Sequence, residues 1–457
     1  MRLSGPVTGG TKGWAFGGST ADLATAGYCQ EEYFVEGDAV RYEPLPGTEL
    51  DWSGRWHVQP VDTAPYKTRM VVVRPTDPAA FNGTVIVLWN NVSAGYENFG
   101  GGDGAEFFES GYAYAAVSAQ RVGVHGTRDN PQGLRAWDPE RYESLSIPSD
   151  DYSFDIFTQV ASLVAPDRPR EGLDPLKGLE VRRLFAQGAS QSAARLATYF
   201  NAVAPLTRRF HAFFLVMYFG AGTSLEVGDE VMTVQAASEG SGPRIPEGEH
   251  LLRDDLGVPL MVLNTECEAT SYYGVRQPDT DRFRYWEVAG ASHVSLQAMA
   301  SSAARMTRDF GVSIPLEEMQ GINQVSLAPV VDAALHHVQA WVSEDISPPV
   351  QPLIEFRGDP PEIVRDDNGI ARGGIRLPQV EVPLAHNSAI RRGPDVFSRL
   401  VGSHESFPVE KVRELYGSRE NYLTNFAEAI RAAQEASIIL TRDADPMLTE
   451  AAEQIPM

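Results

Sequence analysis

Short apolar segments alternate with amphipathic helical patterns along most of the chain. The apolar segments are continuous rather than interrupted by polar residues, which is typical of strands buried on both faces of a parallel sheet. We expect such strands at 70–74, 84–89, 112–119, 184–187, 212–219, 259–264 and 283–288. Helical patterns lie between them, at 105–110, 152–164, 192–204 and 327–342. This alternation predicts an α/β fold with a mainly parallel central sheet.

Two regions depart from this alternation. Residues 222–255 are polar, glycine-rich and acidic, and they separate two predicted strands. Segments of this kind often cover a site, so we expect a cap-like insertion. The tail has a proline-rich link, SPPVQP at 347–352, followed by helical patterns near 407–417 and 419–440. We predict a single domain over residues 1–457, in which residues 344–457 form a C-terminal extension packed on the core.

Composition and charge narrow the range of partners. Hydrophobic residues make up 43 % of the 457 residues, which is enough for a large buried core. Acidic residues number 61 and basic residues 38, so the formal net charge is −23. Such a surface repels phosphate backbones and anionic lipid headgroups. We therefore expect neither nucleic acid nor membrane as a partner.

The cysteines and the apolar runs bear on the compartment of the protein. Cys29 and Cys267 are too few for a disulfide framework, and we expect two reduced thiols. The N-terminal stretch MRLSGPVTGGTKGW has no apolar core of signal-peptide length. The longest apolar run, Phe213–Ala221, is too short to span a bilayer. We therefore expect a soluble, cytoplasmic protein.

An acidic cluster precedes the helix predicted at 152–164. Ser149 is placed to cap that helix, and Asp150 and Asp151 fall in its first turn, where the helix dipole favours negative charge. No paired-histidine spacing accompanies these carboxylates. We therefore expect the cluster to begin a helix, and we expect neither a metal nor a cofactor.

The stretch Leu184–Asn201, LFAQGASQSAARLATYFN, passes from a predicted strand to a predicted helix through a serine. Its GASQS segment at 188–192 resembles the G-x-S-x-G nucleophile elbow, in which the serine sits on a sharp strand-to-helix turn. Residues two before and two after the serine crowd each other and must be small, as Gly188 and Ser192 are. Ser192 departs from the usual second glycine, and the alternative is that Ser190 is only a helix N-cap. We favour the elbow because of the strand before it and the helix after it.

A serine hydroxyl is a weak nucleophile, so it needs a base and an acid that orients the base. With this motif the acid and then the histidine follow the serine along the chain. His293 lies just past the strand predicted at 283–288, where the base is expected. His336 and His337 lie within a helical pattern, and His57 and His125 come before the serine.

The acid should follow the strand predicted at 259–264. Glu266 and Glu268 both come directly after it, and we prefer Glu268 on spacing from Thr265, with Glu266 as the alternative acid. Asp279 and Asp281 are more distant candidates that fit a turn better.

An oxyanion formed at the serine needs two N–H donors. The backbone N–H of Gln191, at the start of the helix, is the first. The second should come from the loop after the strand at 84–89, where the backbone N–H of Asn91, or that of Val92, is the candidate. The glycine-rich stretch Gly100–Gly104 lacks the lysine of a phosphate-binding loop and is interpreted as a flexible rim of the site.

The chain resembles a known family of large α/β-hydrolase-domain proteins over nearly its whole length. The stretches that carry the resemblance are FNGTVIVLWNNVSAG, GYAYAAVSAQRVGV, WDPERYESLSIPSDDYSFDIF, AQGASQSAARLATYFNAV, FRYWEVAGASH and GGIRLPQVEVP. The resemblance implies an α/β-hydrolase fold and a Ser-acid-His triad, which supports Ser190, His293 and an acid within Thr265–Glu268. The family often has a serine at the position of Ser192.

These residues together predict a serine hydrolase that cleaves a small-molecule carboxylic ester or lactone. Ser190 is expected to attack the carbonyl, His293 to take the serine proton, and Glu268 to orient the imidazole. An acyltransferase or an amidase would use the same triad. A non-catalytic binding protein on a hydrolase scaffold is a further alternative, and its signature would be a broken triad, whereas no member is missing here.

Overall fold

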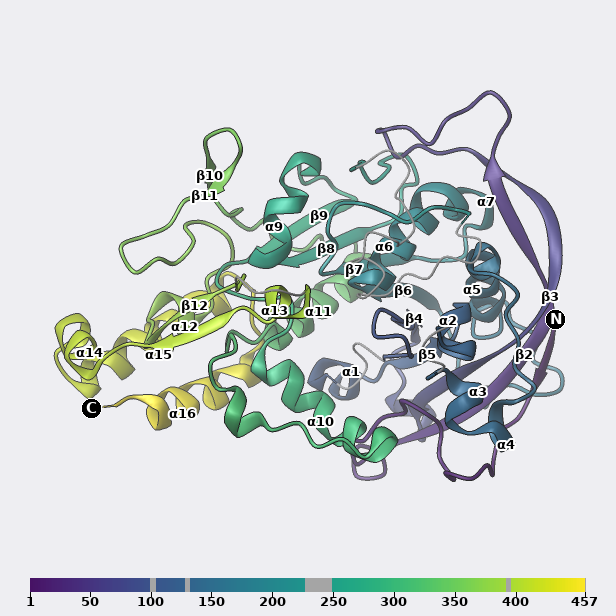
Figure 1. Cartoon of the computed structure of the whole chain (residues 1–457), viewed down its shortest axis with the longest axis horizontal. Helices are drawn as coiled ribbons and strands as arrows, with labels where there is room; N and C mark the ends of the chain where they lie inside the picture. The colour runs from purple at the N-terminus through teal and green to yellow at the C-terminus, as the bar shows by residue number, and fades with distance from the viewer. Residues whose placement is uncertain (99–103, 128–131, 227–248, 392–395, 457) are drawn as a thin grey trace. The chain divides into compact units, whose positions relative to one another are not determined.

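The computed structural model describes residues 1–98, 104–127, 132–226, 249–391 and 396–456, which fall into two compact units (Figure 1). Unit 1 comprises Met1–Leu260 with Gly274–Arg276, and unit 2 comprises Met261–Tyr273 with Gln277–Met457. Most of the insertion predicted at 222–255 lies outside the described residues, as does most of the glycine-rich stretch at 100–104. Each unit is described by itself, so the single domain and its packed extension stay predictions.

The sheet of unit 1 has the strand order β1-β2-β3-β5-β4-β6-β7. The strands β1, β2, β3 and β5 pair antiparallel, whereas β5, β4, β6 and β7 pair parallel. Their bounds are Arg2–Ser4, Tyr28–Pro44, Val58–Pro75, Thr84–Trp89, Ala113–Val117, Arg183–Ala189 and Ala212–Val216, from β1 to β7. The parallel part brings the carboxyl ends of β4 and β6 to the same edge of the sheet.

The parallel strands follow the sequence pattern closely. Every residue of β4, β5 and β7 is buried, as expected of strands covered on both faces. The antiparallel β2–β3 hairpin, the long curved ribbon at one edge of unit 1 in Figure 1, was predicted only at 70–74. Buried and half-exposed residues mix irregularly along β2, so neither strand pattern marks it.

The helices of unit 1 connect these strands. Ser149 accepts a hydrogen bond from the Asp151 N–H at the start of a short 3-10 turn that leads into α5 (Ser153–Ser162), which confirms the predicted cap. The helix predicted at 192–204 begins as α6 (Gln191–Thr198), continues as a π-helical turn at Tyr199–Val203 and ends as α7 (Ala204–Thr207). The remaining helices are short: α1 (Ala105–Glu109), α2 (Arg121–His125), α3 (Leu134–Trp137) and α4 (Pro139–Tyr142).

Unit 2 begins within β8 (Leu260–Thr265), which leads directly into α9 (Glu266–Tyr272). The predicted strand β9 (Phe283–Val288) follows, then α10 (Leu296–Phe310) and the predicted helix α11 (Ala328–Glu344). Two small antiparallel pairs come later, β10 (Phe356–Arg357) with β11 (Glu362–Ile363) and β12 (Ala385–Ser388) with β13 (Ser403–Ser406).

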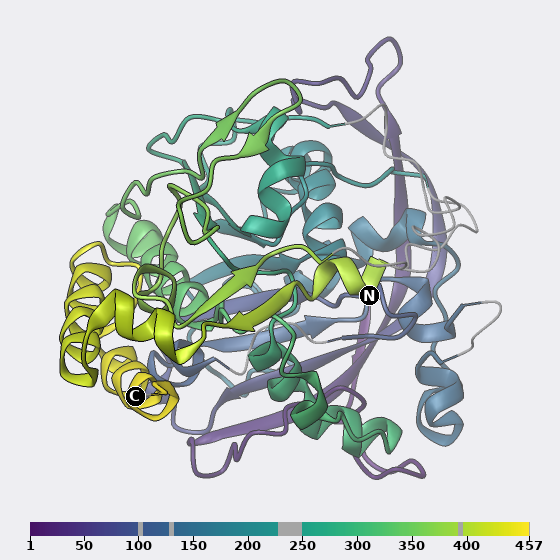
Figure 2. The ribbon, with the colours of Figure 1, turned by 60° about the vertical axis from the view of Figure 1, so that its left-hand side comes forward.

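The end of unit 2 is helical. Helix α15 (Arg419–Glu435) packs against α12 (Pro378–Glu381), α14 (Val409–Tyr416) and α16 (Ala444–Gln454). The colour bar of Figure 2 gives α14, α15 and α16 in yellow. The short α13 (Val396–Leu400) precedes β13. The helical patterns near 407–417 and 419–440 correspond to α14 and α15, whereas α10 and α16 were not predicted.

Candidate active site

Ser190 occupies the single position between β6 and α6. Its backbone has φ 58° and ψ −121°, a conformation that residues with a side chain rarely adopt. The backbone N–H of Ser190 donates to the carbonyl oxygen of Val216 at 2.9 Å, and its hydroxyl makes no capping hydrogen bond to α6. An ordinary N-cap has an extended backbone and uses its side-chain oxygen, so the N-cap alternative is wrong.

The two small residues around Ser190 hold this turn in different ways. A Cβ added to Gly188 would lie 2.6 Å from the carbonyl oxygen of Ser192, so only glycine fits there. Ser192 is buried, and its hydroxyl donates to the carbonyl oxygen of Ala189 and accepts from the Ala189 N–H, both at 2.9 Å. The Ser192 hydroxyl therefore stabilises the turn through two hydrogen bonds that a glycine at this position could not make.

Glu268 and His293 form a buried pair within unit 2. Glu268 Oε1 lies 2.7 Å from His293 Nδ1, and the glutamate side chain is fully buried. The other oxygen, Oε2, accepts from the Thr265 N–H at 2.9 Å and from the Thr265 hydroxyl at 2.6 Å. A carboxylate oxygen only accepts, so His293 Nδ1 carries a proton in this pair.

Glu266 faces other partners than the imidazole. Its Oε2 accepts from the Gly290 N–H at 2.7 Å, and its Oε1 pairs with Arg365 Nη2 at 2.7 Å. Gly290 lies in the loop that ends at His293, so Glu266 holds the loop while Glu268 holds the ring. This geometry favours the preferred acid over the alternative.

The other candidates near the acid also have structural partners. Asp279 pairs with Arg284 at 3.0 Å and accepts from the Tyr285 N–H at 2.9 Å, as a turn residue would. Burial, followed by the charge of Glu268, raises the pKa of the Cys267 thiol well above its ordinary value. Cys267 therefore stays protonated and is not a competing nucleophile.

The two loops at the carboxyl ends of β4 and β6 meet in unit 1. Asn91 Nδ2 donates to the carbonyl oxygen of Ala189 at 2.9 Å, which ties the β4 loop to the elbow. The backbone N–H of Asn91 donates to the carbonyl oxygen of Asn98 at 3.2 Å, whereas that of Val92 donates to the Gln191 side-chain oxygen at 3.2 Å. Of the two candidates for the second donor, Val92 is the one whose N–H bonds to a residue of the elbow, Gln191.

The sequence profile of the alpha/beta hydrolase domain family matches residues 3–449. The chain belongs to the alpha/beta hydrolase family. This confirms the predicted fold class and the family resemblance over nearly the whole sequence. No curated protein matches the chain significantly.

Several solved structures resemble the hydrolase at low identity. A fungal esterase from Rhizomucor miehei is 13 % identical over 67 % of this chain and 84 % of the esterase, with a TM-score of 0.31. Esterase Est22 is 13 % identical over 63 % of this chain and 80 % of its own, with a TM-score of 0.31. A prolyl endopeptidase is 14 % identical over 57 % of this chain, with a TM-score of 0.28, and the match spans only 35 % of the peptidase. The family assignment rests on the sequence profile.

A chain of amide groups fixes the Gln191 side chain. Gln191 Nε2 donates to Gln120 Oε1 at 3.0 Å, and Trp89 Nε1 donates to the same oxygen at 3.0 Å. Gln120 Nε2 in turn donates to Asp150 Oδ2 at 3.0 Å. Because Gln120 and Asp150 are buried, this chain holds Gln191 against the Val92 N–H. Sequence reasoning missed Gln120, and it assigned Asp150 only to a helix start.

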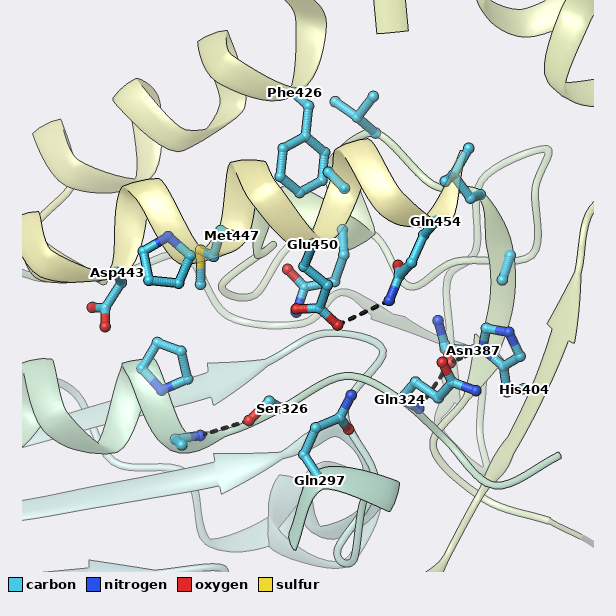
Figure 3. Close-up of a pocket in the computed structure, with 18 of the residues that line it drawn as sticks. Gln297, Gln324, Ser326, Asn387, His404, Phe426, Asp443, Met447, Glu450 and Gln454 are labelled. Atoms are coloured by element: carbon cyan, nitrogen blue, oxygen red, sulfur yellow. Dashed lines mark hydrogen bonds between the residues drawn. The ribbon is translucent and has the colours of Figure 1, made fainter. Parts of the chain in front are cut away.

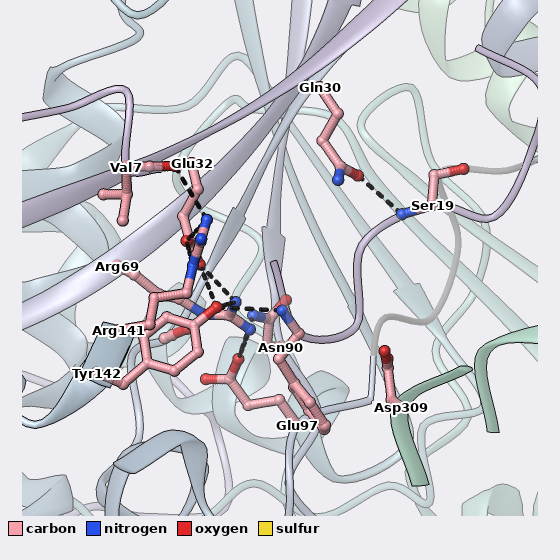
Figure 4. Close-up of polar contacts among 12 residues, drawn as sticks. Val7, Ser19, Gln30, Glu32, Arg69, Asn90, Glu97, Arg141, Tyr142 and Asp309 are labelled. Atoms are coloured by element: carbon pink, nitrogen blue, oxygen red, sulfur yellow. Dashed lines mark hydrogen bonds and ion pairs between the residues drawn. The ribbon is translucent and has the colours of Figure 1, made fainter. Parts of the chain in front are cut away.

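A buried ion-pair network contacts the loop after β4 (Figure 4). Asn90 Nδ2 donates to Glu97 Oε2 at 3.3 Å, and Arg69 Nη2 reaches that oxygen at 2.7 Å. Arg69 also pairs with Glu32 at 2.7 Å, and Glu32 pairs with Arg141 at 2.7 Å. Two arginines balance two glutamates, so the network buries no net charge and fixes Asn90, the residue before Asn91.

Three further features concern metal ligands, thiols and membrane-spanning helices. In the described ranges, no group of three or more His, Cys, Asp or Glu residues is arranged to hold a metal ion. Cys29 and Cys267 are free thiols. No helix in the described part of the chain is long and apolar enough to cross a membrane.

Proposed function

We propose that this protein is a serine hydrolase that cleaves a small-molecule carboxylic ester or lactone. The observation that carries the proposal is the positive φ of Ser190 between β6 and α6, together with a hydroxyl that makes no capping hydrogen bond. Backbone strain of this kind costs about 1–3 kcal/mol and persists where it serves function. A nucleophile elbow is the function that fits a strand-to-helix serine.

The proposed reaction uses Ser190, His293 and Glu268 as the triad. Ser190 Oγ attacks the carbonyl carbon, and its proton passes to His293 Nε2. The imidazolium that forms is stabilised by Glu268, which accepts from Nδ1 at 2.7 Å. The tetrahedral intermediate then collapses: the bond from the carbonyl carbon to the alcohol oxygen breaks, and the imidazolium gives its proton to that oxygen, which leaves the acyl-enzyme and a neutral His293. Water that gives a proton to His293 attacks the acyl-enzyme, the bond to Ser190 Oγ breaks, and the proton returns to Oγ as the acid is released.

We further propose that the oxyanion is bound by the backbone N–H groups of Gln191 and Val92. The Gln191 N–H belongs to the first turn of α6, which has no intrahelical partner for it. The Val92 N–H bonds the Gln191 side-chain oxygen at 3.2 Å, and an oxyanion would replace that neutral acceptor. Asn91, whose N–H bonds Asn98, is assigned to positioning through its side chain.

The test is hydrolysis of a substrate panel by the full-length protein. The panel contains p-nitrophenyl acetate and butyrate, γ- and δ-lactones, and a p-nitroanilide as the amide counterpart. We expect turnover of an ester or a lactone that is lost in Ser190→Ala and faster than turnover of the anilide. Turnover that survives in a clean preparation of Ser190→Ala, or turnover of the anilide alone, would contradict the proposal.

A further inference from the structure

Unit 2 contains a cavity of about 280 Å³ that shares no residue with the proposed triad (Figure 3). Its walls come from the first turn of α10, the segment before α11, the β12–β13 pair, and helices α15 and α16. Segments that are far apart in the sequence therefore combine to enclose it. Its volume is close to the lower end of the range of small-molecule sites, about 300 Å³, and suits a single ring.

Two amide side chains at this cavity, those of Gln297 and Asn387, offer hydrogen-bonding atoms to a ligand. Gln297 Oε1 is buried and has no hydrogen-bond partner among the described residues. Asn387 Oδ1 accepts from the Gln324 N–H at 3.1 Å and from His404 Nδ1 at 3.0 Å, which leaves the Asn387 amide nitrogen available as a donor. An unsatisfied buried polar group costs about 1–3 kcal/mol, so the Gln297 oxygen calls for a molecule that donates a hydrogen bond to it.

The charges around the cavity exclude an anion. Among the residues that line it there is no lysine or arginine, whereas Asp443 and Glu450 contribute carboxylates. Burial lowers the pKa of His404, so its imidazole is neutral at pH 7. Glu450 Oε1 accepts from Gln454 Nε2 at 2.9 Å, so this carboxylate is turned toward an amide rather than a cation. The walls are therefore mostly neutral hydrogen-bonding groups with some negative charge.

One wall of the cavity is apolar. Tyr422 and Phe426 are 2 % and 3 % exposed, and their ring centroids lie 5.7 Å apart. Met447 and Leu384 line the cavity as well. A ligand that fits must combine an apolar face with a rim of donors and acceptors, since apolar surface alone would leave the amides unpaired.

We propose that this cavity binds a neutral polyhydroxylated ring, that is, a free monosaccharide or the glycosyl group of a larger molecule. The hydroxyls donate to Gln297 Oε1 and accept from the Asn387 amide nitrogen, because a hydroxyl does both. The C–H face of the ring packs against Phe426. The proposal does not depend on the ester-cleaving activity.

Binding to the full-length protein tests this proposal. The probes are methyl glucopyranoside and methyl xylopyranoside, measured by saturation-transfer difference NMR and calorimetry, with choline and inorganic phosphate as comparison ligands. For a ligand of this size we expect a Kd of about 1 mM for a glycoside. Choline or phosphate binding more tightly than either glycoside, or no glycoside binding at about 100 times that Kd, would overturn the proposal.

Matched variants locate the binding. Gln297→Leu and Asn387→Leu each remove one proposed contact, and each should weaken glycoside binding at least about tenfold. Gln434→Leu is the control, because Gln434 lies on α15 with Phe426 but does not line the cavity. The unfolding temperature of each variant shows whether it is folded. If both folded cavity variants bind as tightly as the control, the site is elsewhere and the proposal fails.

A larger probe distinguishes a free monosaccharide from the glycosyl group of a larger molecule. A p-nitrophenyl glycoside carries the same ring with a bulky substituent at its anomeric carbon. Binding as tight as that of the methyl glycoside supports the glycosyl group of a larger molecule, whereas loss of binding supports a free monosaccharide. If neither glycoside binds, the proposal is overturned.

Discussion

Two strand-to-helix junctions, one in each unit, place a hydroxyl residue at the same position and use it differently. Thr265, between β8 and α9, has φ −91°, and its hydroxyl accepts from the Cys267 N–H while Glu268 bonds back to the Thr265 N–H. Ser190, between β6 and α6, has φ 58° and no capping hydrogen bond. The first junction is a capping box that stabilises its helix. At the second junction the hydroxyl makes no capping bond, which is consistent with the role that we propose for it.

The two junctions are stabilised by different interactions, and each positions a different side chain. At Thr265 the capping box also fixes Glu268, whose second oxygen meets His293. At Ser190 the strain of a left-handed backbone is offset by the Ser192 hydroxyl and by the close packing that Gly188 permits. One junction positions the carboxylate of Glu268 by ordinary capping, and the other holds the proposed nucleophile in a turn that its neighbours fix.

The largest expected effect is that of removing the uncapped hydroxyl. Ser190→Ala should lower kcat for an ester by about 10⁶-fold, because a triad serine has no substitute. Steady-state and single-turnover hydrolysis of a p-nitrophenyl ester measure the loss. Ser162→Ala is the control, since the Ser162 hydroxyl on α5 donates to the Thr158 carbonyl and lies outside the proposed site. A similar fall in both variants would show that the loss is not specific to the elbow.

The two glutamates at the other junction give the next effect. Glu268→Gln should lower kcat by about 10⁴-fold, because an amide NH₂ placed opposite His293 Nδ1 favours the wrong tautomer. Glu266→Gln keeps an oxygen for the Gly290 N–H and should lower kcat far less. The ratio of the two losses in kcat is the measurement. If Glu266→Gln proves the more damaging, the assignment of the acid is reversed.

Glu266→Gln should also lower the stability of the protein. Glu266→Gln removes the charge that Arg365 meets at 2.7 Å, and it should lower the free energy of unfolding by about 1–3 kcal/mol. Because the Arg365 side chain is 38 % exposed, water replaces part of that interaction, and the lower end is expected. Urea denaturation measures the change. No loss of stability would mean that this ion pair contributes little to unit 2.

Much of this arrangement was predicted from sequence, and what was missed depends on partners distant in the chain. The strand-to-helix turn at Ser190 was predicted because strand, turn and helix are contiguous in Leu184–Asn201. Glu268 and Glu266 could not be separated with certainty, because both fall in the first turn of α9 and their partners come from other segments. The Asn91 N–H was a candidate donor until its bond to Asn98 was known.

The fold shows the same division between local and distant information. Strands buried on both faces, such as β4 and β5, are continuous apolar runs and were predicted nearly in full. The hairpin of β2 and β3 was mostly missed because its polar residues are paired across strands or with loops. Arg69 on β3, for example, forms ion pairs with Glu32 and Glu97. A local sequence pattern cannot predict pairs between residues so far apart in the chain.

The smallest effect compares the two hydroxyls directly. Thr265→Ala should lower the free energy of unfolding by about 1 kcal/mol, because a helix loses its cap. Ser190→Ala should change it by less than about 0.5 kcal/mol, since no capping bond is lost there. Parallel denaturation curves measure both. Equal losses would contradict the contrast between the two junctions.

The central claim is that Ser190 is an activated nucleophile, and covalent labelling tests it most directly. The folded full-length protein is treated with a fluorophosphonate probe, and the adduct is located by intact mass and peptide mapping. The account predicts one adduct, on Ser190, that is lost in His293→Ala. No adduct on the folded protein, or an adduct at another residue, would contradict it.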